Sequence, residues 1–234
     1  MLAAVKEIAV SGTTRLVGIL GWPVEHSLSP RMQNAAFAAL GLDWTYVPLA
    51  TPPDRLADAV RGLGALGFAG ANVTTPHKHR VAHLCMPGSP LSVNTLLVRQ
   101  DGVEGTSTDA AILSGLPAER PVVVGDGGAA TAFVQALPHA RRFSRKTEWP
   151  PAAEGADLVV NATSARDEVI VELVPGQVLV DLPYPETATA EAARRAGAEV
   201  VTGLEILVAQ GAASFELWTG IPAPVEAMRA ALEA

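Results

Sequence analysis

The sequence contains little cysteine, few aromatic residues and no concentrated positive charge. Its single cysteine, Cys85, excludes an intrachain disulfide and is typical of a protein in the reducing cytoplasm. No apolar run is long enough to cross a membrane, and the first ten residues lack a signal-peptide pattern. With 17 Lys and Arg against 24 Asp and Glu, and no basic block, nucleic acid is not expected as a partner. The five histidines show no metal-ligand spacing, so no metal is expected.

Apolar residues are plentiful, and they are arranged in two ways. Of the 234 residues 49% are hydrophobic, which is enough core for one large or two small domains. Short apolar runs that read as buried strands alternate with stretches whose apolar residues follow helical spacing. This alternation predicts an α/β fold with mostly parallel sheets.

The alternation falls into two series, which predict two α/β domains with a ligand cleft between them. The first series predicts strands at 16–20, 45–49 and 70–73, helices at 31–40, 53–66 and 77–84, and a hairpin of 93–99 with 103–105 around Asp101-Gly102. The second predicts strands at 121–124, 142–144, 157–161, 177–181 and 199–202, with helices at 129–137 and 187–196. Two further helices, at 204–218 and 225–232, close the chain.

The second series opens on a glycine-rich turn between a strand and a helix. Its spacing is G-x-G-x-x-A, at Gly125, Gly127 and Ala130. Such a turn brings backbone N–H groups and a helix N-terminus against a pyrophosphate, although glycine turns also occur without a ligand. Asp126 lies within the turn, where its carboxylate opposes phosphate unless it points into solvent.

The residues about twenty positions further on choose between the two nicotinamide cofactors. NAD-binding turns have an Asp or Glu there, which accepts the ribose 2′-hydroxyl. This chain has Ser144-Arg145-Lys146, with Arg145 twenty residues after Gly125. A guanidinium suits a 2′-phosphate, so the spacing favours NADP. The alternative is an ordinary pair of solvated surface cations.

Two polar segments of the first series are candidates for a substrate site. In an extended segment the hydroxyls of Ser27 and Ser29 point the same way and can bind a carboxylate. Ser29, followed by Pro30, is equally suited to cap a helix. The run from Asn72 to Lys78 follows a strand, at the sheet edge where open α/β folds bind ligands.

Together these motifs resemble the shikimate dehydrogenase family. They run in that family's order over nearly the whole chain, from Gly18 to Gly220. The similar segments are GWPVEHSLSP (21–30), NVTTPHK (72–78), SVNT (92–95), GTSTD (105–109), VNATS (160–164), DLPY (181–184) and LVAQGAASFELWTG (207–220).

The resemblance implies an N-terminal α/β substrate domain, 1–108, completed by C-terminal helices in 204–234, and a Rossmann-like NADP-binding domain at 109–203. It implies NADP-dependent interconversion of shikimate and 3-dehydroshikimate in aromatic amino acid biosynthesis, by a cytoplasmic monomer or homodimer. Lys78 and Asp109 would be catalytic. The substrate ligands would be Ser27, Ser29, Asn72, Thr74, Asn94, Tyr184 and Gln210. The cofactor ligands would be Gly125, Asp126, Gly127, Gly128, Ala129, Ser144, Arg145, Lys146, Leu182 and Gly203.

Departures from the family pattern keep alternatives open. Ser107 stands where the family has Asn, Arg166-Asp167 follow the VNATS motif in place of a glycine, and several connections are short. A paralogue acting on quinate or an amino analogue of shikimate is one alternative. A non-catalytic ligand-binding regulator is another, and the presence of both Lys78 and Asp109 argues against it. A methylenetetrahydrofolate-type dehydrogenase would have a different substrate loop.

Overall fold

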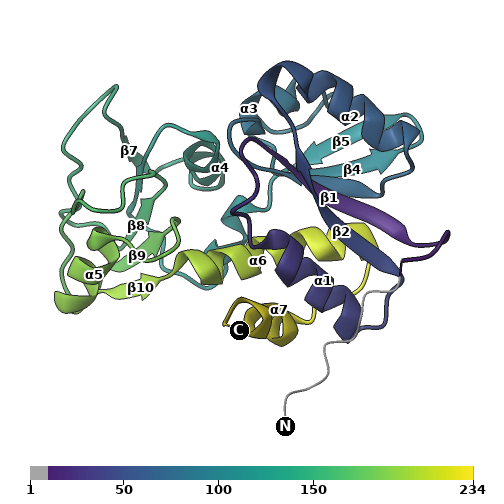
Figure 1. Cartoon of the computed structure of the whole chain (residues 1–234). Helices are drawn as coiled ribbons and strands as arrows, with labels where there is room; N and C mark the ends of the chain where they lie inside the picture. The colour runs from purple at the N-terminus through teal and green to yellow at the C-terminus, as the bar shows by residue number, and fades with distance from the viewer. Residues whose placement is uncertain (1–9, 234) are drawn as a thin grey trace, which may run out of the picture. The chain divides into compact units, whose positions relative to one another are not determined.

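The computed structural model describes residues 10–233, which form two compact α/β units (Figure 1). Of these residues, the first unit combines 10–108 with 211–233, and the second is Asp109–Gln210. The predicted α/β class with mostly parallel sheets is confirmed. Within residues 10–233, no helix is long and apolar enough to cross a membrane.

A mixed five-stranded sheet forms the centre of the first unit, in the order β2-β1-β3-β4-β5. Its strands are β1 Arg15–Gly21, β2 Trp44–Ala50, β3 Gly70–Val73, β4 Thr95–Arg99 and β5 Gly102–Thr106. The first three are parallel, whereas β4 and β5 are antiparallel to their neighbours. The predicted hairpin is present, but Arg99 pairs with Gly102, so its two-residue loop is Gln100-Asp101 and not Asp101-Gly102. Gly102, with φ of +150°, is still part of the ladder.

Helices cover both faces of this sheet, as Figure 1 shows. They are α1 Ser29–Ala39, the 3₁₀ turn η1 Pro53–Arg55, α2 Leu56–Ala65, α3 Lys78–Ala82, the end of α6 Gly203–Thr219, and α7 Val225–Glu233. On the face of α2, Leu56, Val60 and Leu63 pack into one core with strand residues of β1, β3 and β4. These apolar residues recur every three to four positions, which is why this helix packs along one side.

The opposite face of the sheet needs the C-terminal part of the chain. Phe37 of α1 stacks between Trp44 of β2 and Phe215 of α6, with ring centroids 5.6 and 5.3 Å apart. Trp218 of α6 donates a hydrogen bond of 3.0 Å from its indole to the carbonyl of Leu96. The first unit therefore buries aromatic residues from both ends of the sequence in one core.

The second unit has a fully parallel sheet in the order β10-β9-β8-β6-β7. Its strands are β6 Pro121–Val124, β7 Arg141–Phe143, β8 Leu158–Asn161, β9 Val178–Asp181 and β10 Glu199–Val201. Its helices are η2 Asp109–Leu113, α4 Gly128–Ala136, α5 Ala188–Arg195 and the start of α6. The three central strands are buried along their whole length, as expected for a parallel sheet covered on both faces.

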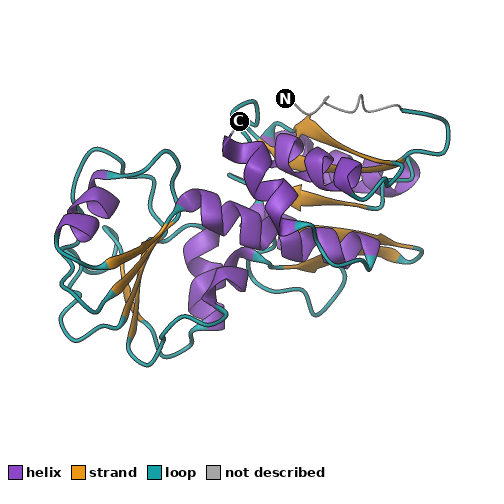
Figure 2. Cartoon of the chain, turned by 90° about the horizontal axis from the view of Figure 1, so that it is seen from below, coloured by secondary structure: helices purple, strands orange, loops and turns teal. Residues whose placement is uncertain are grey.

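Loops make up much of this second unit (Figure 2). The connections β7–β8 and β8–β9 are described throughout and contain no helix. Strand order reverses at β6, which has β7 on one side and β8 on the other. In open α/β sheets ligands bind at the carboxyl ends of the strands at such a reversal, so the loops after β6 and β8 are the place to look for a cofactor site.

Candidate active site

The predicted substrate residues of the first unit gather at one edge of its sheet. Strands β1 and β3 end at this edge, and β4 begins there because it is antiparallel to β3. In register, Asn72 lies opposite Thr95, and Thr95 lies opposite Thr106. The main chain of Val73 donates to the carbonyl of Asn94. Topology therefore assembles motifs that lie far apart in the sequence.

A buried polar network lies behind this edge. Its centre is the carboxamide of Asn72, whose Oδ1 accepts from the Tyr46 hydroxyl at 2.9 Å. The Nδ2 of Asn72 donates to the Ser214 hydroxyl at 2.9 Å and to the carbonyl of Asn94 at 3.1 Å. Both ends of the carboxamide are thus occupied inside the unit. Asn72 thereby positions its neighbours in the network.

Asn94 in turn holds the segment that leads to Asp109. Its Oδ1 accepts from the main chain of Thr108 at 2.7 Å, and its Nδ2 donates to the Thr108 hydroxyl at 3.0 Å. The Ser214 hydroxyl lies 3.1 Å from the Thr108 hydroxyl and 2.9 Å from that of Thr95. Asp109 follows as the first residue of the second unit and is itself buried. The network therefore fixes the backbone at the position before a predicted catalytic residue.

The predicted carboxylate loop follows β1. Helix α1 begins at Ser29, and its N-cap position is Leu28, whose side chain makes no capping hydrogen bond. The alternative role of Ser29 as N-cap is therefore wrong. Its side chain lies in the first turn and is 4% exposed. The hydroxyl of Ser27 accepts from the main chain of Ser29 at 3.3 Å, which orients the pair.

The same loop lies against the segment that carries Lys78. Trp22 donates from its main chain to the carbonyl of Thr75 at 3.1 Å. A Cβ at Gly21 would lie 2.5 Å from the Thr74 side chain, so only glycine permits this approach. Ser27 and Thr74 therefore belong to two loops that lie in contact, and Ser29 follows the first of these loops at the start of α1.

Lys78 opens α3 and is half-buried. Its carbonyl accepts from the main chain of Val93 at 3.0 Å, next to Asn94. The preceding residue, His77, is fully buried, and its Nε2 lies 2.7 Å from the carbonyl of Thr51. Because a carbonyl can only accept, Nε2 carries the proton. The backbone of Lys78 is thus held from two sides.

In the second unit the glycine turn has the predicted strand–turn–helix context. Gly125 has φ of +135°, and a Cβ there would lie 2.8 Å from the carbonyl oxygen of Ala162, so the position requires glycine. Around Gly127, apart from the glycine and its two chain neighbours, no atom of the described residues lies within 4 Å of where a Cβ would be. Gly128 and Ala129 form the first turn of α4. The turn is tight on the sheet side and open above, which fits a bound pyrophosphate.

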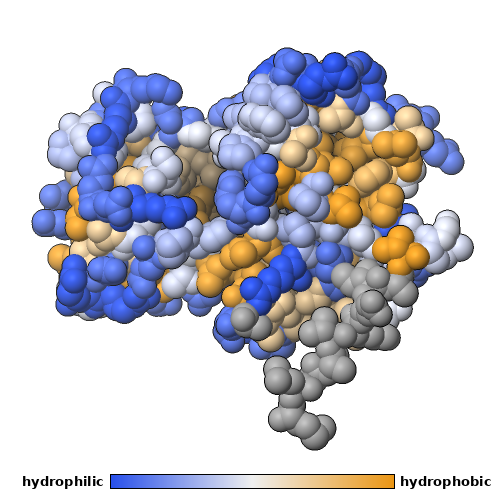
Figure 3. All heavy atoms as spheres, in the orientation of Figure 1, coloured by the Kyte–Doolittle hydropathy of each residue, from blue (hydrophilic) through white to orange (hydrophobic). Residues whose placement is uncertain are grey.

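The turn after β7 carries the predicted 2′-phosphate residues, and the surface of this unit is largely hydrophilic in the view of Figure 3. It is closed by Ser144, whose hydroxyl lies 2.9 Å from that of Thr147. Arg145 and Lys146 are exposed on it, and Lys146 Nζ is 2.6 Å from Asp126 Oδ2. Asp126 is itself exposed, so its carboxylate points into solvent as expected and pairs there with Lys146. The hydrogen bond from Lys146 lowers the pKa of the Asp126 carboxyl, and the cation offsets its charge beside the glycine turn.

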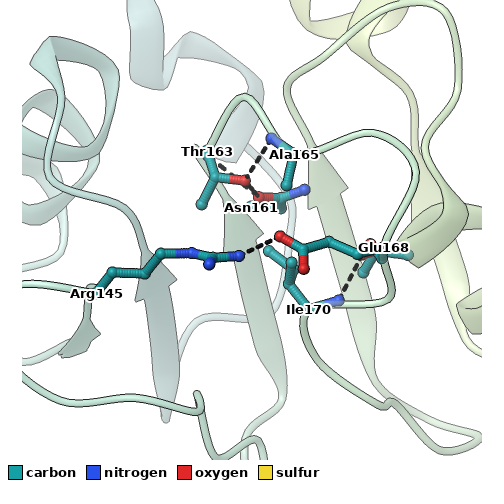
Figure 4. A network of polar contacts seen from close by, with 7 residues as sticks. Arg145, Asn161, Thr163, Ala165, Glu168 and Ile170 are labelled. Atoms are coloured by element: carbon teal, nitrogen blue, oxygen red, sulfur yellow. Dashed lines mark hydrogen bonds and ion pairs between the residues drawn. The ribbon is translucent and has the colours of Figure 1, made fainter.

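Hydrogen bonds to Asp181, at the end of β9, hold the start of the loop after β8. The Asp181 carboxylate accepts from the Asn161 amide at 2.6 Å and from the Thr187 hydroxyl at 2.9 Å. Burial raises the pKa of this carboxyl. Asn161 Oδ1 accepts from the main chain and hydroxyl of Thr163 (Figure 4). This chain of bonds orders the loop that carries the VNATS motif.

The remaining predicted residues follow β9. Leu182 donates to the carbonyl of Asn161, and a Cβ at Gly203 would lie 2.6 Å from the carbonyl oxygen of Leu182, so α6 starts tightly against this segment. Tyr184 is half-buried in the loop between β9 and α5. The half-buried Gln210 donates to the carbonyl of Leu207 on its own helix, at 3.0 Å.

Comparison with known proteins identifies the family. Residues 19–94 match the shikimate dehydrogenase substrate binding domain, and residues 203–233 match the shikimate 5'-dehydrogenase C-terminal domain. A protein of Anaeromyxobacter dehalogenans strain 2CP-C, "Shikimate dehydrogenase (NADP(+))", is 41% identical over 96% of this chain and 98% of its own length. The chain belongs to the shikimate dehydrogenase family.

Solved members of the shikimate dehydrogenase family have the same fold. The Aquifex aeolicus enzyme superposes with a TM-score of 0.84 and 28% identity over 97% of this chain and 100% of that one. The Thermus thermophilus enzyme, solved with NADP(H) and shikimate, gives 0.82 and 29% over 94% and 99%. The alignment with the Anaeromyxobacter relative spans 279 positions, more than the 234 residues of this chain. That relative therefore carries segments that this chain lacks, in agreement with the short connections in the sequence.

Several residues that shape the site were not among the sequence-based candidates. His77 lies inside a recognised motif, immediately before Lys78, and that position was the signal available for it. Thr108 likewise directly precedes Asp109. Tyr46 and Ser214 had no such signal, because their link to the site is a contact between distant segments.

Proposed function

We propose that the protein is an NADP-dependent shikimate dehydrogenase that interconverts shikimate and 3-dehydroshikimate in the cytoplasm. The observation that carries the proposal is the 41% identity, over nearly the full length of both chains, with a relative named for this activity. The Thermus relative, solved with both ligands, adds a matching fold. Assignment of roles to single residues rests on the geometry described above together with the family motifs.

The glycine turn and the turn after β7 are the cofactor-binding elements in this proposal. Gly125, Gly127 and the start of α4 would hold the pyrophosphate, because backbone N–H groups and a helix N-terminus favour anions. Arg145 would contact the 2′-phosphate through its planar set of donors. Ser144 supports this role by closing the turn on which Arg145 lies.

The chemistry needs a proton acceptor beside the ring alcohol. Hydride leaves a carbinol carbon only as its hydroxyl proton departs, and we assign that proton transfer to Lys78. In the reverse direction its ammonium group would stabilise the developing alkoxide. The nicotinamide ring supplies the redox step when bound. Asp109 keeps its predicted role as partner in the proton relay.

The substrate ligands divide by chemistry. Ser27 and Ser29 supply two hydroxyls suited to the carboxylate, and their loop lies in contact with that of Thr74. Asn72, Thr74 and Asn94 are assigned to the ring hydroxyls, and Asn72 also donates to the carbonyl of Asn94. Tyr184 and Gln210 stay predictions from the family motifs.

Absorbance at the nicotinamide band tests the proposal directly. Purified protein is mixed with shikimate and either NADP or NAD, and quinate replaces shikimate in a parallel series. We expect rapid reduction of NADP with shikimate and slower reduction with quinate. Reduction with quinate alone would overturn the substrate assignment, and absence of reduction with either acid would overturn the enzymatic function.

A further inference from the structure

We propose that Glu168 weakens the binding of the cofactor's 2′-phosphate and thereby limits the preference of this protein for NADP over NAD. The inference rests on the proposed function, because it takes Arg145 as the residue that contacts the 2′-phosphate. Glu168 lies in the connection between β8 and β9, outside the family motifs.

The carboxylate of Glu168 forms an ion pair with the guanidinium of Arg145 (Figure 4). On the same guanidinium, the central carbon lies 4.8 Å from the ring centroid of Trp149. One donor edge of Arg145 is therefore occupied by an anion, and an aromatic ring covers one of its faces. A phosphate that approaches Arg145 has to displace the Glu168 carboxylate or share the guanidinium with it.

The backbone holds Glu168 in this position. The hydroxyl of Thr189, a buried residue of α5, lies 3.3 Å from the carbonyl of Glu168, to which it donates, and accepts from the main chain of Ile170 at 3.1 Å. Upstream, the carbonyl of Arg166 accepts from the main chain of Ala188 in α5 at 2.7 Å. The connection is thus tied to α5 on both sides of Glu168, whose carboxylate pairs with Arg145.

Both predicted 2′-phosphate cations have a carboxylate partner before any cofactor binds. Arg145 is paired with Glu168, and Lys146 is paired with Asp126. The sequence taken alone suggests two unpaired cations here; Arg142, which donates to the carbonyl of Gly125, is a further cation beside the glycine turn. A phosphate monoester carries a charge of about −1.5 to −2 at neutral pH, whereas the 2′-hydroxyl of NAD carries none. Glu168 therefore opposes NADP and leaves NAD unaffected.

Glu168→Gln removes the charge and keeps the size of the side chain. We expect the dissociation constant for NADP, measured by titration calorimetry, to fall about two- to fivefold, the usual effect of an exposed ion pair. The constant for NAD should not change, and the gain for NADP should shrink at high salt. Glu172→Gln, an exposed residue of the same connection, is the matched control and should change neither constant.

The Arg145→Ala background separates competition from a structural effect. There Glu168→Gln should improve NADP binding less than it does in the wild type, because competition for the guanidinium is gone and only the weaker, screened repulsion between Glu168 and the phosphate is left. If Glu168→Gln alone leaves NADP binding unchanged or weakens it, or shifts the dissociation constant for NAD equally, the role of Glu168 is overturned. The proposed function still stands in that case if the wild type turns over shikimate with NADP. If the wild type neither binds NADP nor oxidises shikimate, the proposed function fails first and this inference with it.

Discussion

Replacing Ser214 with alanine tests whether the C-terminal helix organises the substrate edge. Ser214 lies on α6, is fully buried and contacts three side chains of the first unit. Its hydroxyl is 2.9 Å from Asn72 Nδ2, 2.9 Å from the Thr95 hydroxyl and 3.1 Å from the Thr108 hydroxyl. The substitution removes all three bonds and leaves the methylene in place.

The expected loss is moderate, because each partner keeps another hydrogen bond. Asn72 Nδ2 still donates to the carbonyl of Asn94, and the hydroxyls of Thr95 and Thr108 still lie within bonding distance of the Asn94 side chain. No group becomes unsatisfied, so we expect the free energy of unfolding to fall by about 1–2 kcal/mol. Orphaned buried groups would cost about 1–3 kcal/mol each.

Urea unfolding followed by tryptophan fluorescence measures this change, since Trp44 and Trp218 belong to the same core. Ser114→Ala, at an exposed position, is the control and should stay within about 0.5 kcal/mol of wild type. We also expect the KM for shikimate to rise, because Asn94 loses support through Thr95 and Thr108. A Ser214→Ala variant that is as stable as the control, with an unchanged KM, would refute the role given to this network.

Four further predictions follow from single contacts. Lys78→Ala should lower kcat by about 10²- to 10⁴-fold with NADP affinity unchanged, whereas Arg80→Ala, exposed on the same helix, should have no effect on steady-state rates. Arg145→Asp should raise the KM for NADP at least about tenfold and that for NAD far less, and equal losses would contradict its assignment. Gly70→Ala should lower the free energy of unfolding by about 1–3 kcal/mol in the same urea assay, because the added methyl would overlap the Leu96 carbonyl and the Trp218 indole. An unchanged urea midpoint would show that the backbone of the sheet shifts to accommodate the methyl group. Burial raises the pKa of Cys85 from its ordinary 9.0 to about 11. Its alkylation by iodoacetamide at pH 8 should therefore be about a hundredfold slower than that of an unperturbed thiol. The alkylation rate should increase as the pH rises toward this pKa, and also when the protein is unfolded in urea.

Local sequence patterns alone were sufficient for the elements and for the glycine turn. The strands of both sheets and most helices lie within one or two residues of the predicted ranges, because apolar period and glycine stops are local signals; α2 begins three residues after the predicted start, since 53–55 form a 3₁₀ turn. Gly125 was predictable for the same reason, since a tight turn between a strand and a helix requires a backbone that only glycine adopts readily. The order of the family motifs along the chain likewise identified the family without a structure.

Tertiary structure decided which side chains meet. Asn72 and Ser214 are 142 positions apart, and Leu96 and Trp218 are 122 apart, so no local pattern pairs them. Their contacts exist because β3 lies next to β4 and the end of α6 packs on that sheet. The same holds for charge. Arg145 and Lys146 were predicted as two available cations, whereas the fold brings Glu168 and Asp126 against them. The order of strands in a sheet is set by the burial of the apolar faces of the sheet and its helices. The hydrogen-bond partners of single polar side chains are a consequence of that order.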